Sequence, residues 1–200
     1  MQPPPRRADA ARNRERLLAA ADIVLNSHGA AASLDEIAKL AGVGNATLYR
    51  HFPTRGRLIE AVYEQRIQDL CDSARGSAAA PDPGAALTAW LRFVAAHVTN
   101  SRLLREAFLA DHPGPADVEP PQATAWHDSL FEAAAPLLAR AQDAGAVRPD
   151  IGIAELLTFL TAATRAAPLC ADRALELLME GVLPRPALAP ARPDTAAGSN

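Results

Sequence analysis

Cysteines and long apolar runs are scarce in this sequence. The two cysteines, Cys71 and Cys170, are too few and too far apart to indicate a disulfide framework or a zinc site, and we expect two buried, reduced thiols. No stretch approaches the roughly 18 apolar residues of a membrane-spanning helix, and no apolar leader is seen at the amino-terminal end. We therefore expect a cytoplasmic protein without disulfide bonds.

The short motifs of common catalytic sites are also missing. There is no phosphate-binding glycine-rich loop, no Gly-x-Ser-x-Gly elbow and no His-Glu-x-x-His sequence. Two adjacent acid–histidine pairs, Asp111-His112 and His127-Asp128, are weak candidates for a metal cluster, and solvated surface is the better interpretation of both. The sequence thus predicts a protein that is not an enzyme and that uses no cofactor and no metal.

Composition and charge favour helices and an unequal division of the chain. Hydrophobic residues make up 49% of the sequence, alanine is abundant and aromatic residues are only 4%, which favours packed helices over a sheet. The net charge of −3 is uneven, because residues 1–57 hold nine cations against five anions, or +4, and the remainder carries −7. A basic head joined to an acidic body fits a head that meets phosphate.

The stretch over residues 33–52 reads as two short helices set across a tight turn. Ser33 and Glu36 are spaced as a capping box at the start of the first helix. Gly42 ends that helix, because glycine accepts the left-handed conformation of a sharp exit. Val43 is the single apolar residue of the turn and is expected to pack between the two helices.

The second of these helices has an apolar side and a polar side. Either Gly44 or Asn45 caps it, and Leu48 and Phe52, four residues apart, face inward together. The outer face has no long acidic side chain and consists of Asn45, Ala46, Thr47, Tyr49, Arg50 and His51. Such groups donate hydrogen bonds to phosphate oxygens and base edges. The pair of helices therefore predicts a helix-turn-helix whose second helix enters the major groove of DNA.

A resemblance to a known family lies in the segment GVGNATLYRHFPTRGRLIEAV, which is similar to the amino-terminal signature of the TetR family of bacterial transcriptional repressors. The similarity rests on the Gly-Val turn, the Leu-Tyr-x-His-Phe end of the second helix and the basic Arg55 beyond it, and covers roughly residues 12–65. It implies an all-α fold of about nine helices. The expected parts are a three-helix DNA-binding head over 1–54, an effector-binding and dimerisation body over 55–185 and a disordered tail over 186–200.

The resemblance also implies roles for single residues. In the family, the positions that match Tyr49, His51 and Arg55 typically touch the DNA backbone. The positions nearest the bases match Asn45, Ala46, Thr47 and Arg50. Gly44 stands where the family often has a polar residue, which leaves one side chain fewer for readout. The predicted DNA-binding set is Ser33, Gly44, Asn45, Ala46, Thr47, Tyr49, Arg50, His51 and Arg55.

Helical periodicity continues on both sides of this unit. The further helices are expected over about 11–27, 54–74, 85–99, 101–110, 122–144, 153–166 and 171–183. Pro136 either kinks the long helix over 122–144 or starts a second segment. The Pro-rich stretches are expected to form an arm, a mobile loop and a disordered tail, over 1–11, 111–121 and from Pro184 onward.

The last two helices, over 153–166 and 171–183, are apolar around much of their circumference. One exposed apolar side on each would form a patch too large for a stable monomer. Pairing across a two-fold axis into a four-helix bundle buries that patch, and internal core packing is the alternative. We favour a homodimer through these helices, because two-fold proteins read two half-sites about 34–36 Å apart.

Aromatic residues and a histidine on the body helices suggest a cavity for a small effector. His97 shares a helix side with Trp90 and Val94, and a polar group in an apolar setting is typical of small-ligand sites. The pocket candidates are Trp90, Phe93, His97, Phe108, Trp126 and Phe131. Ordinary core packing explains each of them equally well.

Together these features predict a DNA-binding transcriptional regulator, expected to be a repressor that an effector releases from a palindromic operator. Two alternatives remain. One is an enzyme or small-molecule carrier that retains the head as structure only, which predicts that the body covers the DNA-facing side of the second helix. The other is an architectural DNA-binding protein, which predicts a body without an enclosed cavity.

Overall fold

In the computed structural model, which describes residues 5–111 and 121–183, every regular element is helical. The α-helices of this part are α1 (Pro5–His28), α2 (Leu34–Ala41), α3 (Asn45–His51), α4 (Arg55–Ser77), α5 (Pro83–Asn100), α6 (Arg102–Asp111), α7 (Pro121–Asp143), α8 (Ile153–Ala166) and α9 (Ala171–Val182). Two 3-10 turns precede α2 and α9, namely η1 (Gly29–Ala31) and η2 (Pro168–Cys170). The predicted all-α fold is confirmed. No single helix of the described residues is long and apolar enough to cross a membrane.

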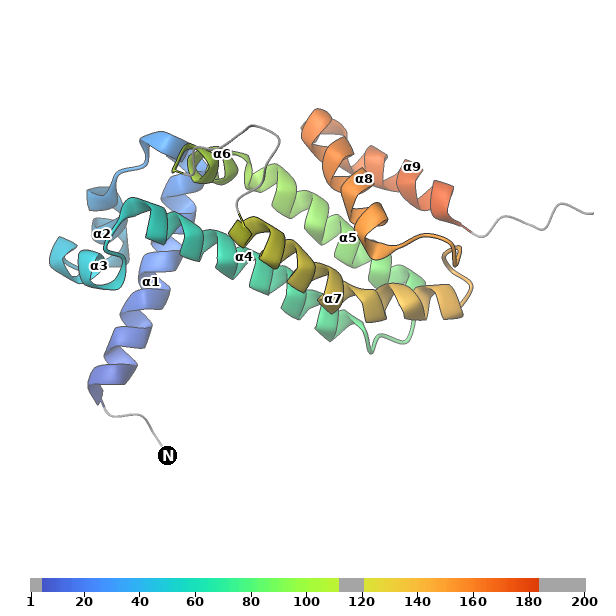
Figure 1. Cartoon of the computed structure of the whole chain (residues 1–200), viewed down its shortest axis with the longest axis horizontal. Helices are drawn as coiled ribbons and strands as arrows, with labels where there is room; N and C mark the ends of the chain where they lie inside the picture. The colour runs from blue at the N-terminus through green and yellow to red at the C-terminus, as the bar shows by residue number, and fades with distance from the viewer. Residues whose placement is uncertain (1–4, 112–120, 184–200) are drawn as a thin grey trace, which may run out of the picture.

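The three N-terminal helices form a head at one end of the molecule (Figure 1). α1 packs against α2, and the side chains of Leu17, Ile37 and Leu48 are almost fully buried in the core of the head. The same hydrophobic cluster continues into α4 through Leu58 and into α6 through Phe108. The head therefore shares its core with the start of α4 and with α6.

The body is built around a second cluster of apolar side chains from α4, α5, α7, α8 and α9. α4 packs along α7, and α5 contacts this pair as well as the last two helices (Figure 1). Trp90 of α5 is enclosed in this core, and its Nε1 donates to the carbonyl of Leu70 on α4 at 3.1 Å. That bond satisfies the one polar atom of a large buried side chain. Since α4 takes part in both cores, it joins the head to the body.

One helix start differs from the sequence expectation, and the structure decides one alternative that the sequence left open. α1 begins at Pro5 rather than near Ala11. Proline is favourable in the first turn of a helix, because its fixed φ is helical and because backbone N–H groups in that turn have no acceptor within the helix. α7 continues past Pro136, so no second segment starts there. Its neighbours Ala134 and Leu137 are fully buried, and this packing outweighs the cost of about 3 kcal/mol of an interior proline.

The cysteines have different surroundings. Cys71 is buried on α4, as expected, whereas Cys170 is exposed in η2. The expectation of two buried thiols is therefore wrong for Cys170, because this residue lies in a surface turn rather than on the apolar side of a helix. Both thiols are free.

The remaining sequence expectations fall largely outside the described residues. These are the first part of the predicted arm (1–4), the predicted mobile loop (112–120) and the predicted tail (184–200). The two ends of the predicted loop are described, and both Asp111 and Pro121 are helical.

Candidate DNA interface and ligand cavity

The turn between α2 and α3 is built around Gly42. Its φ of 64° lies in the left-handed region, where glycine has no Cβ to clash. The Gly42 N–H donates to the Lys39 carbonyl at 3.1 Å and the Val43 N–H to the Ala38 carbonyl at 3.0 Å, which closes the end of α2. A Cβ on residue 42 would also displace the guanidinium of Arg16, the flexible end of an exposed side chain on α1. The predicted glycine stop is confirmed, and it turns the chain sharply into α3.

One side of α3 is anchored in the core of the head, and the other is open. Leu48 and Phe52 are almost fully buried and Val43 packs partly buried against the same cluster, as their positions predicted. On the opposite side Tyr49 is 49% exposed, and Arg50 is exposed as well. This openness is the reverse of the covered surface that the carrier alternative predicts.

The open side of α3 carries most of the predicted DNA-binding residues. Exposed side chains are those of Asn45, Ala46, Tyr49 and Arg50, and the half-buried ones are those of Thr47 and His51. Asn45 is already engaged within the head, because its Nδ2 donates to Oδ1 of Asp35 on α2 at 2.7 Å. Gly44 has an extended backbone and occupies the N-cap position of α3, which decides between the two predicted caps.

The predicted capping box at the start of α2 does not form. Ser33 stands at the N-cap position with an extended backbone, but its exposed side chain makes no capping hydrogen bond. Glu36 instead approaches the end of α1, where its Oε2 lies 3.7 Å from Nδ1 of His28. A capping box requires the Glu36 carboxylate at the Ser33 backbone N–H, whereas here it lies toward α1.

Arg55 differs from the other predicted DNA contacts because its side chain is bound to the protein. Nη1 donates to the Ala32 carbonyl at 2.7 Å and Nη2 to the Gly29 carbonyl at 3.2 Å. Nε lies 3.9 Å from Oδ2 of Asp111 at the end of α6, and the side chain is 30% exposed. Arg55 therefore connects the segment between α1 and α2 with the start of α4 and the end of α6. A basic residue at a helix start gives no sequence signal that separates this role from a phosphate contact.

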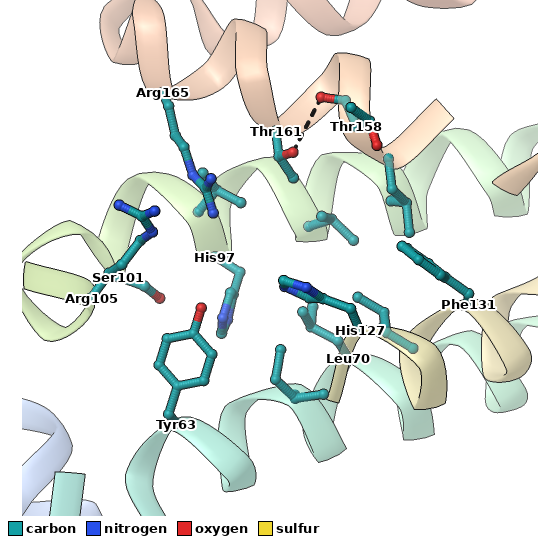
Figure 2. Close-up of a pocket in the computed structure, with 15 residues that line it drawn as sticks. Tyr63, Leu70, His97, Ser101, Arg105, His127, Phe131, Thr158, Thr161 and Arg165 are labelled. Carbon is teal, nitrogen blue, oxygen red and sulfur yellow. Dashed lines mark hydrogen bonds between the residues drawn. The ribbon is translucent and has the colours of Figure 1, made fainter. Parts of the chain in front are cut away.

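A cavity of about 310 Å³ opens inside the body (Figure 2). α4 contributes Tyr63 and Leu70 to its wall, α5 contributes His97, and α7 contributes His127 and Phe131. α6 and α8 complete the wall. Its volume is within the range of small-ligand sites.

The structure places two of the six predicted pocket residues in this wall, His97 and Phe131. Trp90 is part of the body core instead, with its indole bound to a carbonyl of α4. Phe93 is exposed on α5. The helical period places residues three and four apart on one side, but it does not tell which side meets the cavity.

Phe108 and Trp126, the other two predicted pocket residues, form an aromatic cluster with Tyr63. The ring centroid of Tyr63 lies 5.1 Å from that of Phe108 and 5.2 Å from that of Trp126, and both pairs are stacked. Tyr63 lines the cavity and packs against both hydrophobic clusters. The two residues therefore lie beside the cavity without lining it.

Sequence reasoning missed most of the polar wall of the cavity. His97, Ser101 and Arg105 recur at intervals of four residues from α5 into α6, and Thr161 and Arg165 are spaced in the same way on α8. A stripe of polar residues on the buried side of a helix indicates a cavity wall, because polar groups buried in an apolar core without hydrogen bonds are destabilising.

A chain of polar contacts runs from this wall to the head. Arg66 on α4 forms an ion pair with Asp22 of α1, and its Nη1 donates to Oγ of Ser101 in the wall. The pKa of His97 is lowered to about 4, first because the imidazole is buried and second because the charge of Arg66 is near. His97 is therefore a neutral imidazole at pH 7, while Arg66 carries the charge.

The last two helices expose an apolar side. Leu156 of α8 and Leu175 of α9 are buried in the body core, whereas Phe159 is 55% exposed and Leu177 is 53% exposed. α8 and α9 contact each other, so these exposed side chains belong to adjacent helices. A surface of this composition is what the predicted homodimer requires.

The two acid–histidine pairs do not meet in the described residues. Asp111 faces Arg55, and His127 stacks on Phe131 with a ring centroid distance of 6.4 Å. His112 lies outside the described residues. No group of three or more histidine, cysteine, aspartate or glutamate side chains in the described part is placed to hold a metal ion.

Two family models match the chain. The model described as "Bacterial regulatory proteins, tetR family" matches residues 17–62, which include α2, α3 and the start of α4. The model described as "Transcriptional regulator SbtR-like, C-terminal domain" matches residues 82–184, which include α5 to α9.

Solved structures are similar over nearly the whole chain. A TetR transcriptional regulator from Streptomyces coelicolor is 33% identical, with 86% of this chain and 99% of that chain covered at a TM-score of 0.70. A TetR transcription regulatory protein from Mycobacterium vanbaalenii is 35% identical, with 90% and 100% covered at a TM-score of 0.70. SmeT, the repressor of the Stenotrophomonas maltophilia multidrug efflux pump SmeDEF, is 18% identical and similar in fold, with 89% and 94% covered at a TM-score of 0.57.

Proposed function

Because the chain belongs to the TetR family of bacterial transcriptional regulators, we propose that it is a homodimeric, cytoplasmic repressor that an effector in the body cavity releases from a palindromic operator. The observation that carries this proposal is the two-sided α3, with Leu48 and Phe52 in the core of the head and polar side chains outside. A short helix held in this way presents a fixed surface to the major groove.

In this proposal the open side of α3 makes two kinds of contact. Tyr49 and His51 touch phosphates, which fixes the position of the head on the duplex. Base edges in the major groove are reached by Asn45, Thr47 and Arg50. The rest of the proposed interface consists of Ser33, Gly44, Ala46 and Arg55.

A second copy of the chain is proposed to pair through α8 and α9. The exposed Phe159 and Leu177 support this pairing, because burying such side chains between two copies is favourable by about 25 cal/mol for each Å² of apolar area. Two-fold pairing then sets the separation of the two heads, which must match half-sites about 34–36 Å apart.

Release follows from a shift between two arrangements of the heads. In one arrangement the separation of the heads matches the half-sites, and in the other it does not. An effector that binds the second arrangement more tightly lowers the operator affinity, at most by the ratio of its own affinities for the two arrangements. The contacts from Ser101 through Arg66 to Asp22 support a physical route for this effect, because they join the cavity wall to α1.

The experiment for this proposal is selection of binding sites from randomised duplex DNA, followed by fluorescence anisotropy on the enriched site. We expect a palindrome, and the logarithm of the affinity should fall with the logarithm of the salt concentration, with a slope of about −0.9 for each phosphate contact. Arg50→Gln should lower the affinity and change the preference between site variants. Lys39→Gln, which removes an exposed cation on α2 outside the proposed interface, should leave that preference unchanged. Selection that enriches no sequence, or an affinity that is independent of salt, would contradict the proposal.

A further inference from the structure

The charged groups of the cavity wall have one sign. Arg105 and Arg165 line the cavity, and no carboxylate belongs to the described residues that line it. The other titratable groups of the wall are Tyr63, His97 and His127. A cavity wall of this composition has a positive potential, which attracts anions and repels cations.

Arg105 is the cation on which this argument rests. Among the described residues, no carboxylate forms an ion pair with its guanidinium, and its side chain is half-buried. The acid next to it, Glu106, faces Arg102 instead, with 3.7 Å between Oε1 and Nη1. A half-buried guanidinium holds its charge and offers a fork of N–H donors that fits a carboxylate.

Two groups near the wall, Asp22 and His97, do not cancel this charge. Asp22 does not line the cavity, and its carboxylate is engaged by Arg66. His97 is neutral at pH 7, because burial and the charge of Arg66 lower its pKa to about 4. It therefore adds a polar contact to the wall without adding or removing charge.

The two ends of the cavity differ in charge. Figure 2 shows Arg105 and Arg165 toward one end and Phe131 at the other. The apolar side chains of the wall include Leu130 and Leu157, and the polar groups near Phe131 are the uncharged Thr158 and the ring of His127, which stacks on Phe131. A ligand that fits both ends has a charged group at one end and an apolar body at the other.

From this arrangement we infer that the effector is an organic anion, a small carboxylate whose charged group binds at Arg105 and whose apolar body extends toward Phe131. This inference rests on the proposed function, because it names the class of effector that the cavity takes.

Matched probes test the inference with the purified full chain. 4-Phenylbutanoate, 4-phenylbutanamide and 4-phenylbutylamine share one apolar body and differ in charge, and hexanoate, octanoate and decanoate are compared with their own amides and amines. Titration calorimetry measures each affinity. We expect at least one carboxylate to bind about tenfold or more tightly than its amide, the order expected of a charge-assisted hydrogen bond, and its amine to bind more weakly still.

Variants then assign the preference to one residue. Arg105→Gln should bring the ratio of carboxylate to amide affinity close to one without changing the affinity for the amide, and Arg105→Lys should keep a preference for the carboxylate. The control is Arg102→Gln, which removes an exposed cation from the same helix outside the cavity and should leave the ratio unchanged.

Three results would overturn the inference: amides or amines that bind as tightly as the carboxylates, a ratio that Arg105→Gln leaves unchanged, and no binding of any carboxylate at about 1 mM. The probe series on the unaltered chain decides the sign of the preference even if Arg105→Gln does not fold. DNA binding is measured separately without probes. If the unaltered chain binds the operator but shows no anion preference, this inference alone is rejected. If the unaltered chain prefers anions but binds no DNA, the proposed function is rejected.

Discussion

The guanidinium of Arg66 on α4 pairs with the carboxylate of Asp22 on α1, although 44 residues separate them in the sequence. The side chain of Arg66 is 13% exposed and that of Asp22 is 37% exposed, so the pair is partly removed from water. Attraction between charges is stronger there than between fully hydrated side chains. Side-chain contacts, and not only the chain itself, thus connect the head with the body.

A double-mutant cycle should measure this connection. For Asp22→Asn, Arg66→Gln and the double variant, we expect a coupling of about 1 kcal/mol in the free energy of unfolding, because the hydration of Asp22 reduces the effect of burial. Urea unfolding at pH 7 is the measurement. The matched cycle of Asp72→Asn and Arg75→Gln uses an exposed ion pair of the same helix, for which we expect less than about 0.5 kcal/mol. Equal coupling in the two cycles would show that the Asp22–Arg66 pair adds no more than a surface pair.

Arg55→Ala and Arg50→Ala should separate stability from DNA binding. Arg55→Ala removes the hydrogen bonds to the carbonyls of Gly29 and Ala32, so we expect the free energy of unfolding to fall by about 1–3 kcal/mol. Arg50 is exposed, so Arg50→Ala should change that free energy by less than about 0.5 kcal/mol.

The same two variants differ in their expected effect on DNA. Arg55→Ala should weaken binding to all sequences alike, whereas Arg50→Ala should change the preference between operators. Anisotropy titrations on a set of mutated sites measure both effects. If Arg55→Ala leaves the unfolding curve in place and still weakens DNA binding, Arg55 is a phosphate contact and not a structural link.

The two turn glycines should respond differently to alanine. Gly42→Ala places a Cβ at φ 64° and against the guanidinium of Arg16, so we expect a loss of about 1–2 kcal/mol in the free energy of unfolding. Gly44 has a φ of −78° and nothing within 4 Å of an added Cβ, so Gly44→Ala should change stability by less than about 0.5 kcal/mol. Chemical denaturation of both variants is the measurement, and a larger loss for Gly44→Ala would contradict this reading of the turn.

Stability should fall in acid in a way that depends on His97. Its pKa is lowered to about 4 in the folded chain and is about 6.5 when unfolded, so the unfolded chain binds the extra proton between these values. The contribution of His97 is fully present above about pH 6.5 and is lost as the pH falls through about 4, up to about 3 kcal/mol in total. His97→Gln should therefore lose less stability than the unaltered chain between pH 7 and pH 4.5 in urea unfolding. Identical losses would show that burial does not disfavour the imidazolium.

The exposed apolar side of α8 and α9 should hold two copies together. We expect Phe159→Glu and Leu177→Glu to yield monomers, because each places a charge where the proposed interface is apolar. Sedimentation equilibrium measures the mass. Leu40→Glu alters a side chain of similar exposure on α2 of the head and should leave the dimer intact. If both α8 and α9 variants remain dimeric, the chain pairs through another surface.

The turn before α3 and the buried side of α3 were predictable because their signals are local. Gly42 ends α2 through its own backbone conformation, and the spacing of Leu48 and Phe52 fixes which side of α3 is buried. The bounds of α8, Ile153–Ala166, agree with the sequence prediction, and Gly152 and Ala167 occupy its two cap positions. Signals of this kind depend on a few neighbouring residues.

The failures arise where the outcome depends on how separate elements pack against each other. Glu36 was assigned to Ser33, but in the folded head its Oε2 lies 3.7 Å from Nδ1 of His28 at the end of α1. Trp90 and His97 lie on one side of α5, yet only His97 reaches the cavity. Which residue meets open space depends on how α5 is placed against its neighbours, and no short stretch of sequence contains that information.

The shared core of the head limits how regulators of this kind can be recombined. Leu48 of α3 and Phe108 of α6 belong to one hydrophobic cluster, so a cut after residue 54 divides it. A chimera that joins this head to the body of a relative at that point would inherit mismatched packing at the junction. Under the proposed function, DNA specificity is exchanged without loss of folding by replacing the side chains on the outer face of α3 and leaving the rest of the head with its own α4 and α6.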